Sequence, residues 1–174
     1  MKRSLSLPLL ILCLCVAAVF LLLHCGKEGK APLSSLAPDF ALRTLNGEEI
    51  TLSKLKGKVV LLDFWATWCA PCRESIPHLV QLHKTYQEKG LEVIGMNVDR
   101  GDVDTVRRFA KSMEIRYPIV IAQDEVQRNY GVTGIPMTVL IDRDGRIRQK
   151  FMGFTNGISI QITATVNDLT SEKH

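Results

Sequence analysis

The sequence predicts an α/β fold with a mixed central sheet flanked by helices. First, segments with the composition of buried strands alternate with segments of helical periodicity between residues 59 and 169, which is typical of βαβ units. Second, the pair Asn46-Gly47 lies inside residues 40–52 and is a strong two-residue turn signal, so an N-terminal β-hairpin is expected. A length of 174 residues allows one such domain with an N-terminal extension.

Five segments have the composition of strands in the main sheet. The first two are apolar on both faces, as expected for central strands that are covered on each side. The last two flank the turn sequence Asp-Arg-Asp-Gly and are predicted to form a hairpin. The five segments are residues 59–65, 91–98, 118–122, 138–141 and 146–152.

Four segments between or after these strands are predicted helices. The first carries a broad apolar stripe, contains Pro77, which should kink it, and is closed by Gly90. The last has a high content of β-branched residues and still has helical spacing. A basic turn is expected at residues 54–58, ahead of the first central strand. The predicted helices are residues 69–89, 102–112, 123–130 and 158–169.

Residues 1–25 form a separate unit. Lys2 and Arg3 precede an uncharged stretch, Leu5 to Leu23, of 19 residues. This is longer than the apolar part of a cleavable signal and approaches the ~20 residues that span a bilayer. We predict an uncleaved signal anchor with its N-terminus inside. Lipoprotein processing at Cys25 is the alternative, although His24 stands where a small residue is usual.

The remaining chain divides into a linker at residues 26–36 and a domain at residues 37–174. Of five cysteines, only Cys69 and Cys72 lie in the domain. A disulfide scaffold would distribute cysteines through the fold, so a single close pair indicates chemistry instead. The net charge of +4 is too weak and too evenly spread to indicate a nucleic-acid surface.

Cys69 and Cys72 form a Cys-x-x-Cys pair between a predicted strand and a predicted helix, which is typical of a redox-active dithiol. A thiolate at the start of a helix is stabilised by unpaired backbone N–H groups and the helix dipole. Cys72 lies one turn further into the helix, where it is more buried. The pair is also half of a zinc site, but the chain offers no second pair to complete it. We expect neither a metal nor a cofactor.

Asp63 is the only charged residue in the run from Val59 to Ala66. A carboxylate on a buried strand is costly and tends to take up a proton. Because Asp63 precedes Cys69 by six residues, it should lie beneath the dithiol. We hypothesise that it exchanges a proton with Cys72 as the disulfide opens and closes.

Residues near the dithiol include candidates for substrate contact. Trp68 is expected to flank the active site and Trp65 to lie in the core. Ile135-Pro136 precedes a predicted strand, and a cis bond there would turn the Ile135 backbone toward the cysteines for pairing with a substrate peptide. From spacing alone, a trans proline is expected, since few X–Pro bonds are cis.

These motifs together resemble the thioredoxin fold, specifically the membrane-anchored TlpA/ResA type of thiol-disulfide oxidoreductase. The resemblance covers roughly residues 37–170, including the N-terminal hairpin and the inserted helical segment near residues 102–112. The matching sequences are Phe-Trp-Ala-Thr-Trp-Cys-Ala-Pro-Cys-Arg at 64–73, Ile-Pro at 76–77, Gly-Ile-Pro at 134–136 and Thr-Val-Leu-Ile-Asp at 138–142.

The resemblance implies that Cys69 attacks, that Cys72 resolves, and that Pro136 is a cis-proline facing the disulfide. It also implies an extracytoplasmic (periplasmic) domain that reduces disulfides in exported proteins, with apocytochrome c as the best-known substrate class. A membrane electron donor would recharge the thiols. Three positions depart from related proteins: Asp63 stands where many members have Asn, Ser75 where an acid is common, and Gly95 where thioredoxin has a lysine near its buried acid.

Two other functions known on this fold fit the sequence less well. A copper-binding assembly factor typically has three residues between its cysteines and a distant histidine, and here two residues intervene and no histidine stands at the expected place. A thiol peroxidase needs a Pro and a Thr ahead of its peroxidatic cysteine, and here only Thr67 is present. His78 and His83, on the helix after the dithiol, are expected to be surface or packing residues.

Overall fold

The structure is a computed structural model that describes residues 35–172. The predicted signal anchor, Cys25 and most of the linker lie outside these residues. The main sheet has five strands in the order β5-β4-β3-β6-β7. Their bounds are β3 Val59–Trp65, β4 Leu91–Asn97, β5 Ile119–Ile121, β6 Met137–Ile141 and β7 Ile147–Met152.

The sheet is mixed, as predicted. Strand β3 pairs parallel with β4 and antiparallel with β6, and all seven of its residues are buried. Strand β5 adds in parallel to β4, and β7 adds antiparallel to β6. The unbroken apolar run of β3 therefore reflects its central place in a sheet covered on both faces.

Within residues 35–172, four α-helices correspond to the four predicted segments. They are α2 Ala70–Tyr86, α3 Val103–Ser112, α4 Asp124–Tyr130 and α5 Asn156–Ser171. A short 3-10 helix, η2 Gln87–Lys89, extends α2, and Gly90 ends it at φ 90°, a backbone conformation that favours glycine. Side chains of Asp102 and Thr155 cap α3 and α5. The predicted bounds differ from these by a few residues at most.

The N-terminal hairpin is also confirmed. Strands β1 Ala41–Arg43 and β2 Glu49–Thr51 pair antiparallel in a separate two-stranded sheet, and Gly47 has φ 90° in the connection. A 3-10 helix, η1 Leu52–Leu55, begins before the expected basic turn and occupies its first two residues, because the chain coils directly after β2.

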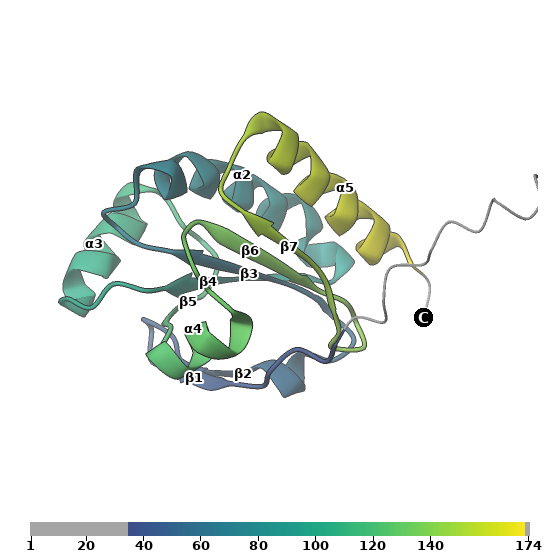
Figure 1. Cartoon of the computed structure of the whole chain (residues 1–174), viewed down its shortest axis with the longest axis horizontal. Helices are drawn as coiled ribbons and strands as arrows, with labels where there is room; N and C mark the ends of the chain where they lie inside the picture. The colour runs from purple at the N-terminus through teal and green to yellow at the C-terminus, as the bar shows by residue number, and fades with distance from the viewer. Residues whose placement is uncertain (1–34, 173–174) are drawn as a thin grey trace, which may run out of the picture. The chain divides into compact units, whose positions relative to one another are not determined.

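The two faces of the main sheet are covered differently. Figure 1 shows α2 and α5 on one face, and α4 with the β1–β2 hairpin on the other. Side chains of β3 alternate between the faces: Val60, Leu62 and Phe64 pack in the core shared with α4 and the hairpin. Val59 and Leu61 pack toward α2 and α5, so Asp63 and Trp65 belong to this second face.

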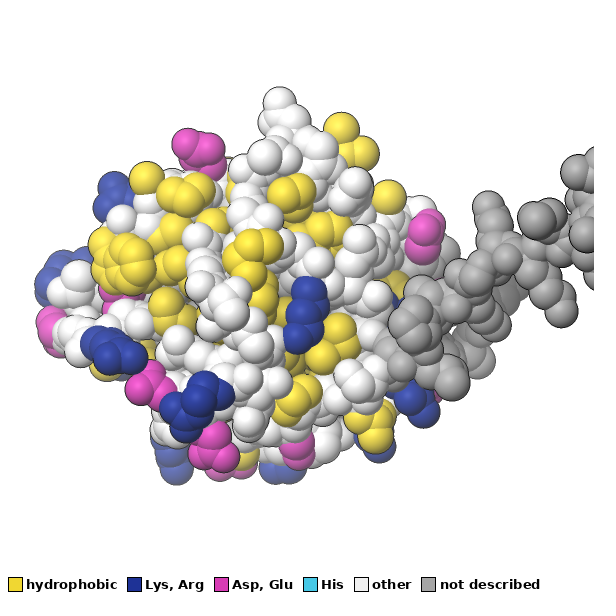
Figure 2. All heavy atoms as spheres, viewed as in Figure 1, with side chains coloured by type: hydrophobic (Ala, Val, Ile, Leu, Met, Phe, Trp, Pro, Cys, Tyr) yellow, Lys and Arg dark blue, Asp and Glu magenta, His cyan; other side chains and the backbone are white. Residues whose placement is uncertain are grey.

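The surface carries both signs of charge. Figure 2 shows basic and acidic side chains interspersed around one face, with hydrophobic groups between them. Among residues 35–172, no helix has the length and apolar character needed to cross a membrane.

Candidate active site

The two domain cysteines form a disulfide at the start of α2. The Cys69 and Cys72 sulfur atoms are 2.03 Å apart. Cys69 is the N-cap residue of α2, and its Sγ accepts a hydrogen bond of 3.2 Å from the Cys72 backbone N–H. Cys72 is fully buried and Cys69 is 5% exposed. The predicted order of burial is therefore correct.

The position of Cys69 explains how its sulfur can become a nucleophile. The first N–H groups of a helix have no partner within the helix, and one of them already points at the Cys69 Sγ. Once the disulfide is reduced, this N–H group and the helix dipole stabilise a thiolate there. Cys72 lies inside the helix and is fully buried, so its sulfur is further from solvent than that of Cys69.

Asp63 lies in the middle of β3 and is fully buried. Both carboxyl oxygens lack a hydrogen-bond partner among the described residues. Burial raises the pKa of Asp63 to about 7. The Asp63 side chain lies on the sheet face that α2 covers, because side chains alternate along β3. Trp65, two residues later on the same face, packs in the cluster that contains both cysteines. The Asp63 carboxyl group is able to gain and lose a proton near neutral pH.

The neighbour of Asp63 on the next strand is Gly95, as the comparison with thioredoxin predicted. A Cβ atom at Gly95 would lie 3.0 Å from Trp65 Nε1 and 3.2 Å from Tyr117 Cε2. These rings occupy the space that a side chain on Gly95 would need. Asp63 consequently has no cationic partner at this position.

The peptide bond between Ile135 and Pro136 is cis. The expectation of a trans proline from spacing was wrong, and the expectation from the resemblance was correct. The reason is that the isomer of an X–Pro bond is decided by tertiary context, which local spacing does not contain. Pro136 leads directly into β6, and its carbonyl accepts a 2.8 Å hydrogen bond from the Gly153 N–H. Ile135 packs against the cluster that contains the disulfide.

The two tryptophans lie in opposite environments. Trp68, next to Cys69, is 68% exposed, and Trp65 is fully buried and stacks on Phe109 with ring centroids 5.3 Å apart. Both placements agree with the sequence. Met137, after the cis-proline, is buried and packs in the core on the other face of the sheet.

The loop before Cys69 is held by residues that the sequence analysis missed. Asp99 accepts hydrogen bonds from the Thr67 N–H at 2.9 Å, from the Thr67 hydroxyl at 3.0 Å and from the Asn97 amide at 2.7 Å. Arg73 donates to the Thr67 carbonyl oxygen at 2.8 and 3.2 Å. The available signal was the pair Asn97 and Asp99 at the end of β4, since the carboxyl ends of parallel strands share one edge.

The remaining polar residues of α2 lie where the sequence analysis expected them, on the surface or packed against neighbours. Ser75, three residues after Cys72, is buried and donates to the Cys72 carbonyl at 2.9 Å, and Glu74 is exposed. His78 and His83 are half-buried. Within residues 35–172, no group of three or more His, Cys, Asp or Glu side chains is arranged to hold a metal ion.

Comparison with known proteins gives consistent results. The model of the AhpC/TSA family matches residues 33–150. Thiol-disulfide oxidoreductase ResA of Bacillus thuringiensis subsp. konkukian is 37% identical over 155 residues, which cover 87% of this chain and 89% of that protein. The ResA of Bacillus subtilis is 35% identical over 140 residues, covering 80% of this chain and 77% of that protein.

Solved structures agree in fold. A thiol:disulfide interchange protein of the thioredoxin family from Chlorobium tepidum has a TM-score of 0.71 and 30% identity, covering 79% of this chain and 97% of that one. The thioredoxin domain of a thiol-disulfide oxidoreductase from Bacteroides vulgatus has a TM-score of 0.68 and 27% identity, covering 79% and 100%. The chain therefore belongs to the AhpC/TSA family of thioredoxin-fold proteins and is a thiol-disulfide oxidoreductase of the ResA type.

Proposed function

We propose that this protein reduces disulfides of exported proteins, with Cys69 as the attacking thiolate, Cys72 as the resolving thiol and Asp63 as the proton partner of Cys72. The observation that carries the proposal is the sharing of one sheet face by a helix-capping cysteine sulfur and a buried, unpartnered carboxyl group. Apocytochrome c before haem attachment is the substrate class we favour. The oxidoreductase activity itself is common to the ResA relatives.

The reaction starts from the reduced protein. The Cys69 thiolate attacks one sulfur of the substrate disulfide, and the first substrate sulfur leaves as a thiolate that takes up a proton. Cys72 then loses its proton to the Asp63 carboxylate and attacks the Cys69 sulfur. This step releases the second substrate thiolate and forms the Cys69–Cys72 disulfide. Two electrons pass to the substrate, and a membrane thiol donor restores the dithiol.

The buried position of Asp63 suits this role. With its pKa raised to about 7 by burial, the carboxyl group is partly ionised at neutral pH. It is therefore able to accept the Cys72 proton in one half of the cycle and to return it in the other. A carboxyl group with an ordinary pKa would hold the proton too weakly for this exchange.

Substrate contact is proposed for the groups around the disulfide. Trp68 offers an exposed aromatic surface next to Cys69. We propose that the backbone of Ile135, ahead of the cis-proline, pairs with an extended substrate segment, as in strand addition. We further propose that the N-terminal segment fixes this domain on the extracytoplasmic side of a membrane.

The first experiment measures the reduction potential of the Cys69–Cys72 couple in the full chain by equilibration with glutathione buffers. A value near that of thioredoxin, about −270 mV, supports a reductase. A value near about −120 mV identifies an oxidant that introduces disulfides and overturns the proposed direction.

A second experiment tests Asp63. The rate of thiol exchange with a small disulfide is measured from pH 5 to pH 9 for the wild type and Asp63→Asn. We expect the variant to be slower near neutral pH and to retain its fold by circular dichroism. Equal rates at every pH would remove Asp63 from the mechanism.

A further inference from the structure

A set of unpartnered polar groups surrounds Gly95. Within residues 35–172, the Asp63 carboxyl oxygens, Trp65 Nε1 and the Tyr117 hydroxyl are all buried and lack a hydrogen-bond partner. Gly95 pairs with Asp63 on one side and with Ile119 on the other. Both aromatic rings lie within 3.2 Å of the position that a Cβ on Gly95 would take. The two rings therefore fill the space over Gly95 and lie beside the strand position of Asp63 on the α2 face of the sheet.

His83 extends this set toward the surface. Its Nδ1 atom is also buried without a partner among the described residues. The His83 ring lies edge-on to the Tyr117 ring, with centroids 6.0 Å apart. Because His83 is on α2 and half-buried, it connects this interior to solvent. Tyr117 stands between the buried carboxyl group and the imidazole.

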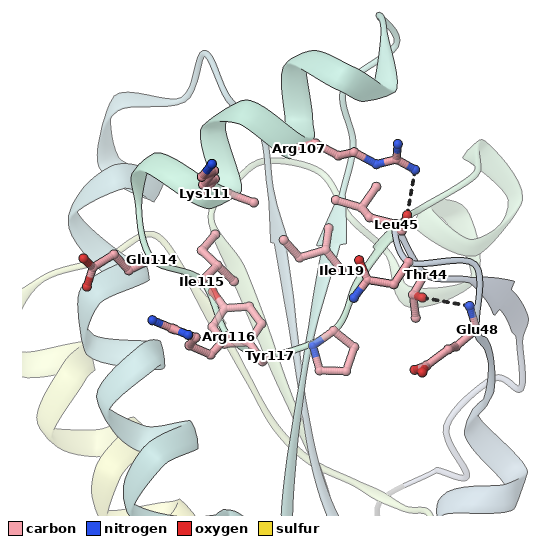
Figure 3. Close-up of a pocket in the computed structure, with 13 residues that line it drawn as sticks. Thr44, Leu45, Glu48, Arg107, Lys111, Glu114, Ile115, Arg116, Tyr117 and Ile119 are labelled. Atoms are coloured by element: carbon pink, nitrogen blue, oxygen red, sulfur yellow. Dashed lines mark hydrogen bonds between the residues drawn. The ribbon is translucent and has the colours of Figure 1, made fainter.

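The pocket on the other side of Tyr117 does not provide the same connection. This pocket, of about 760 Å³, lies between α3 and the β1–β2 connection, and Tyr117 is part of its wall. Figure 3 shows Tyr117 there below Ile115. The hydroxyl oxygen of Tyr117 is nevertheless buried, and the residue as a whole is 3% exposed. Solvent in the pocket therefore does not reach this hydroxyl group.

The surroundings of Asp63, Tyr117 and His83 favour the uncharged form of each side chain, and uncharged groups of this kind can pass a proton along. Burial, and secondarily the charge of Asp63, raise the pKa of Tyr117 well above its ordinary value. Burial lowers the pKa of His83, and the nearby charge of Glu92 opposes that effect. Burial alone raises the pKa of Asp63, with no charged side chain among its causes. At neutral pH the tyrosine keeps its proton and the imidazole is uncharged, so each is able to take a proton from one side and give one to the other.

We propose that Tyr117 and His83 form a proton route between Asp63 and solvent, with ordered water bridging the gaps between them. A buried water typically binds about three otherwise unpartnered polar groups, and Asp63, Trp65 and Tyr117 supply that number. In the net step, protonated Asp63 loses one proton, the Tyr117 hydroxyl gains one and passes one on, and His83 releases one to solvent. This inference rests on the proposed role of Asp63, and it assigns Tyr117 and His83 as positioning residues.

The test uses the full chain with ¹³C-labelled aspartate. The Asp63 resonance is identified by its loss in Asp63→Asn and titrated by NMR, and thiol exchange with a small disulfide is timed from pH 5 to pH 9. In Tyr117→Phe we expect the titration midpoint to rise by about 0.5 to 1 pH unit, because a donor that reaches the ionised carboxylate through the bridging water is lost. We also expect exchange above pH 7 to slow by about threefold to tenfold.

His83→Gln and Tyr130→Phe complete the design. His83→Gln should slow exchange with little change in the Asp63 midpoint, and added imidazole should restore the rate. Tyr130→Phe removes a buried tyrosine hydroxyl on the other face of the sheet, so neither quantity should change. If Tyr117→Phe does not fold, His83→Gln with imidazole decides the question alone.

The outcomes separate this inference from the proposed function. Slow exchange in Asp63→Asn with wild-type rates and midpoints in both Tyr117→Phe and His83→Gln would overturn the proton route and leave the role of Asp63 intact. Wild-type exchange in Asp63→Asn would overturn both.

Discussion

The two buried tyrosines of this protein lie on opposite faces of one sheet and differ in the hydrogen bonding of their hydroxyl groups. Tyr130 packs among the apolar residues shared by α4 and the hairpin, and its hydroxyl donates a 2.7 Å hydrogen bond to the Pro38 carbonyl. Tyr117 packs on the α2 face, and its hydroxyl has no partner among the described residues. One hydroxyl therefore links two segments that are distant in the sequence, and the other does not.

The difference reaches beyond the tyrosines. An unpartnered buried polar group costs about 1–3 kcal/mol of stability, and the α2 face, which also carries the disulfide, holds several of them. The hairpin face is a continuous apolar core by comparison. The protein thus concentrates its costly groups on the face that carries its chemistry, as expected when function and stability compete.

The largest expected effect that separates the two faces is the pH dependence of the free energy of unfolding caused by Asp63. Its pKa in the folded protein is about 7 against an ordinary 3.8, so the folded state holds a proton that the unfolded state has lost between these pH values. Stability is therefore highest below pH 4 for this group and falls as the pH rises through 7. The full loss is about 4 kcal/mol, at about 1.4 kcal/mol per pH unit.

Urea unfolding of the oxidised wild type and Asp63→Asn at pH 5 and pH 8 measures this loss. The variant should be the more stable protein at pH 8, and its advantage should shrink at pH 5. An advantage that is the same at both pH values would mean that Asp63 is not protonated by burial.

The second effect concerns the apolar face. Leu62 is fully buried beside Phe64 and Tyr130, so Leu62→Ala should lower the free energy of unfolding by about 3 kcal/mol through the cavity it leaves. The Asp63 titration should be unchanged, because Leu62 points to the other face. A shifted Asp63 midpoint in this variant would show that the two faces are coupled.

The third effect concerns the loop before the disulfide. Asp99→Asn replaces an acceptor of three hydrogen bonds with an amide that presents N–H groups to donors, at a cost of about 2 kcal/mol. Thiol exchange should also slow, because Thr67 and the following residues lose their fixed position. Asp104→Asn, at an exposed ion pair with Arg107, is the matched control and should change stability by less than about 0.5 kcal/mol.

The smallest effect compares the tyrosines directly. Tyr130→Phe leaves the Pro38 carbonyl without its donor and should cost about 1 kcal/mol. Tyr117→Phe removes a hydroxyl that has no protein partner and should cost less than that. Chemical denaturation of both variants at pH 7 gives the two values. A larger loss for Tyr117→Phe would reverse the contrast between the faces.

Local sequence patterns were sufficient for most of the fold. The run at residues 59–65 identified the central strand, and Gly90 and Asn46-Gly47 marked a helix end and a turn. Cys69 and Cys72 were placed at the start of a helix because they stand between a predicted strand and a predicted helix. These features depend on neighbours in the sequence, which periodicity and turn chemistry record.

The parts that were missed depend on contacts between distant segments. Asp99 reaches Thr67 across two strands, and His83 meets Tyr117 between a helix and a strand end. Neither pair has a spacing that signals the contact. The cis bond before Pro136 is of the same kind, since its isomer was indicated by family resemblance and not by spacing.

The first described residues lie far from the disulfide. Backbone hydrogen bonds join Ala37 to Gly145 and Ile147 to Ser35, so the first described residues are fixed beside the β6–β7 turn. That turn lies near Val60, the start of β3, because Val60 pairs with Ile141, whereas the disulfide follows the other end of β3. Residues 35–37 and the two sulfur atoms therefore lie at opposite ends of the sheet, about 20 Å apart along β3. Residues 35–37 therefore do not cover Trp68, whose side chain stays 68% exposed next to the disulfide.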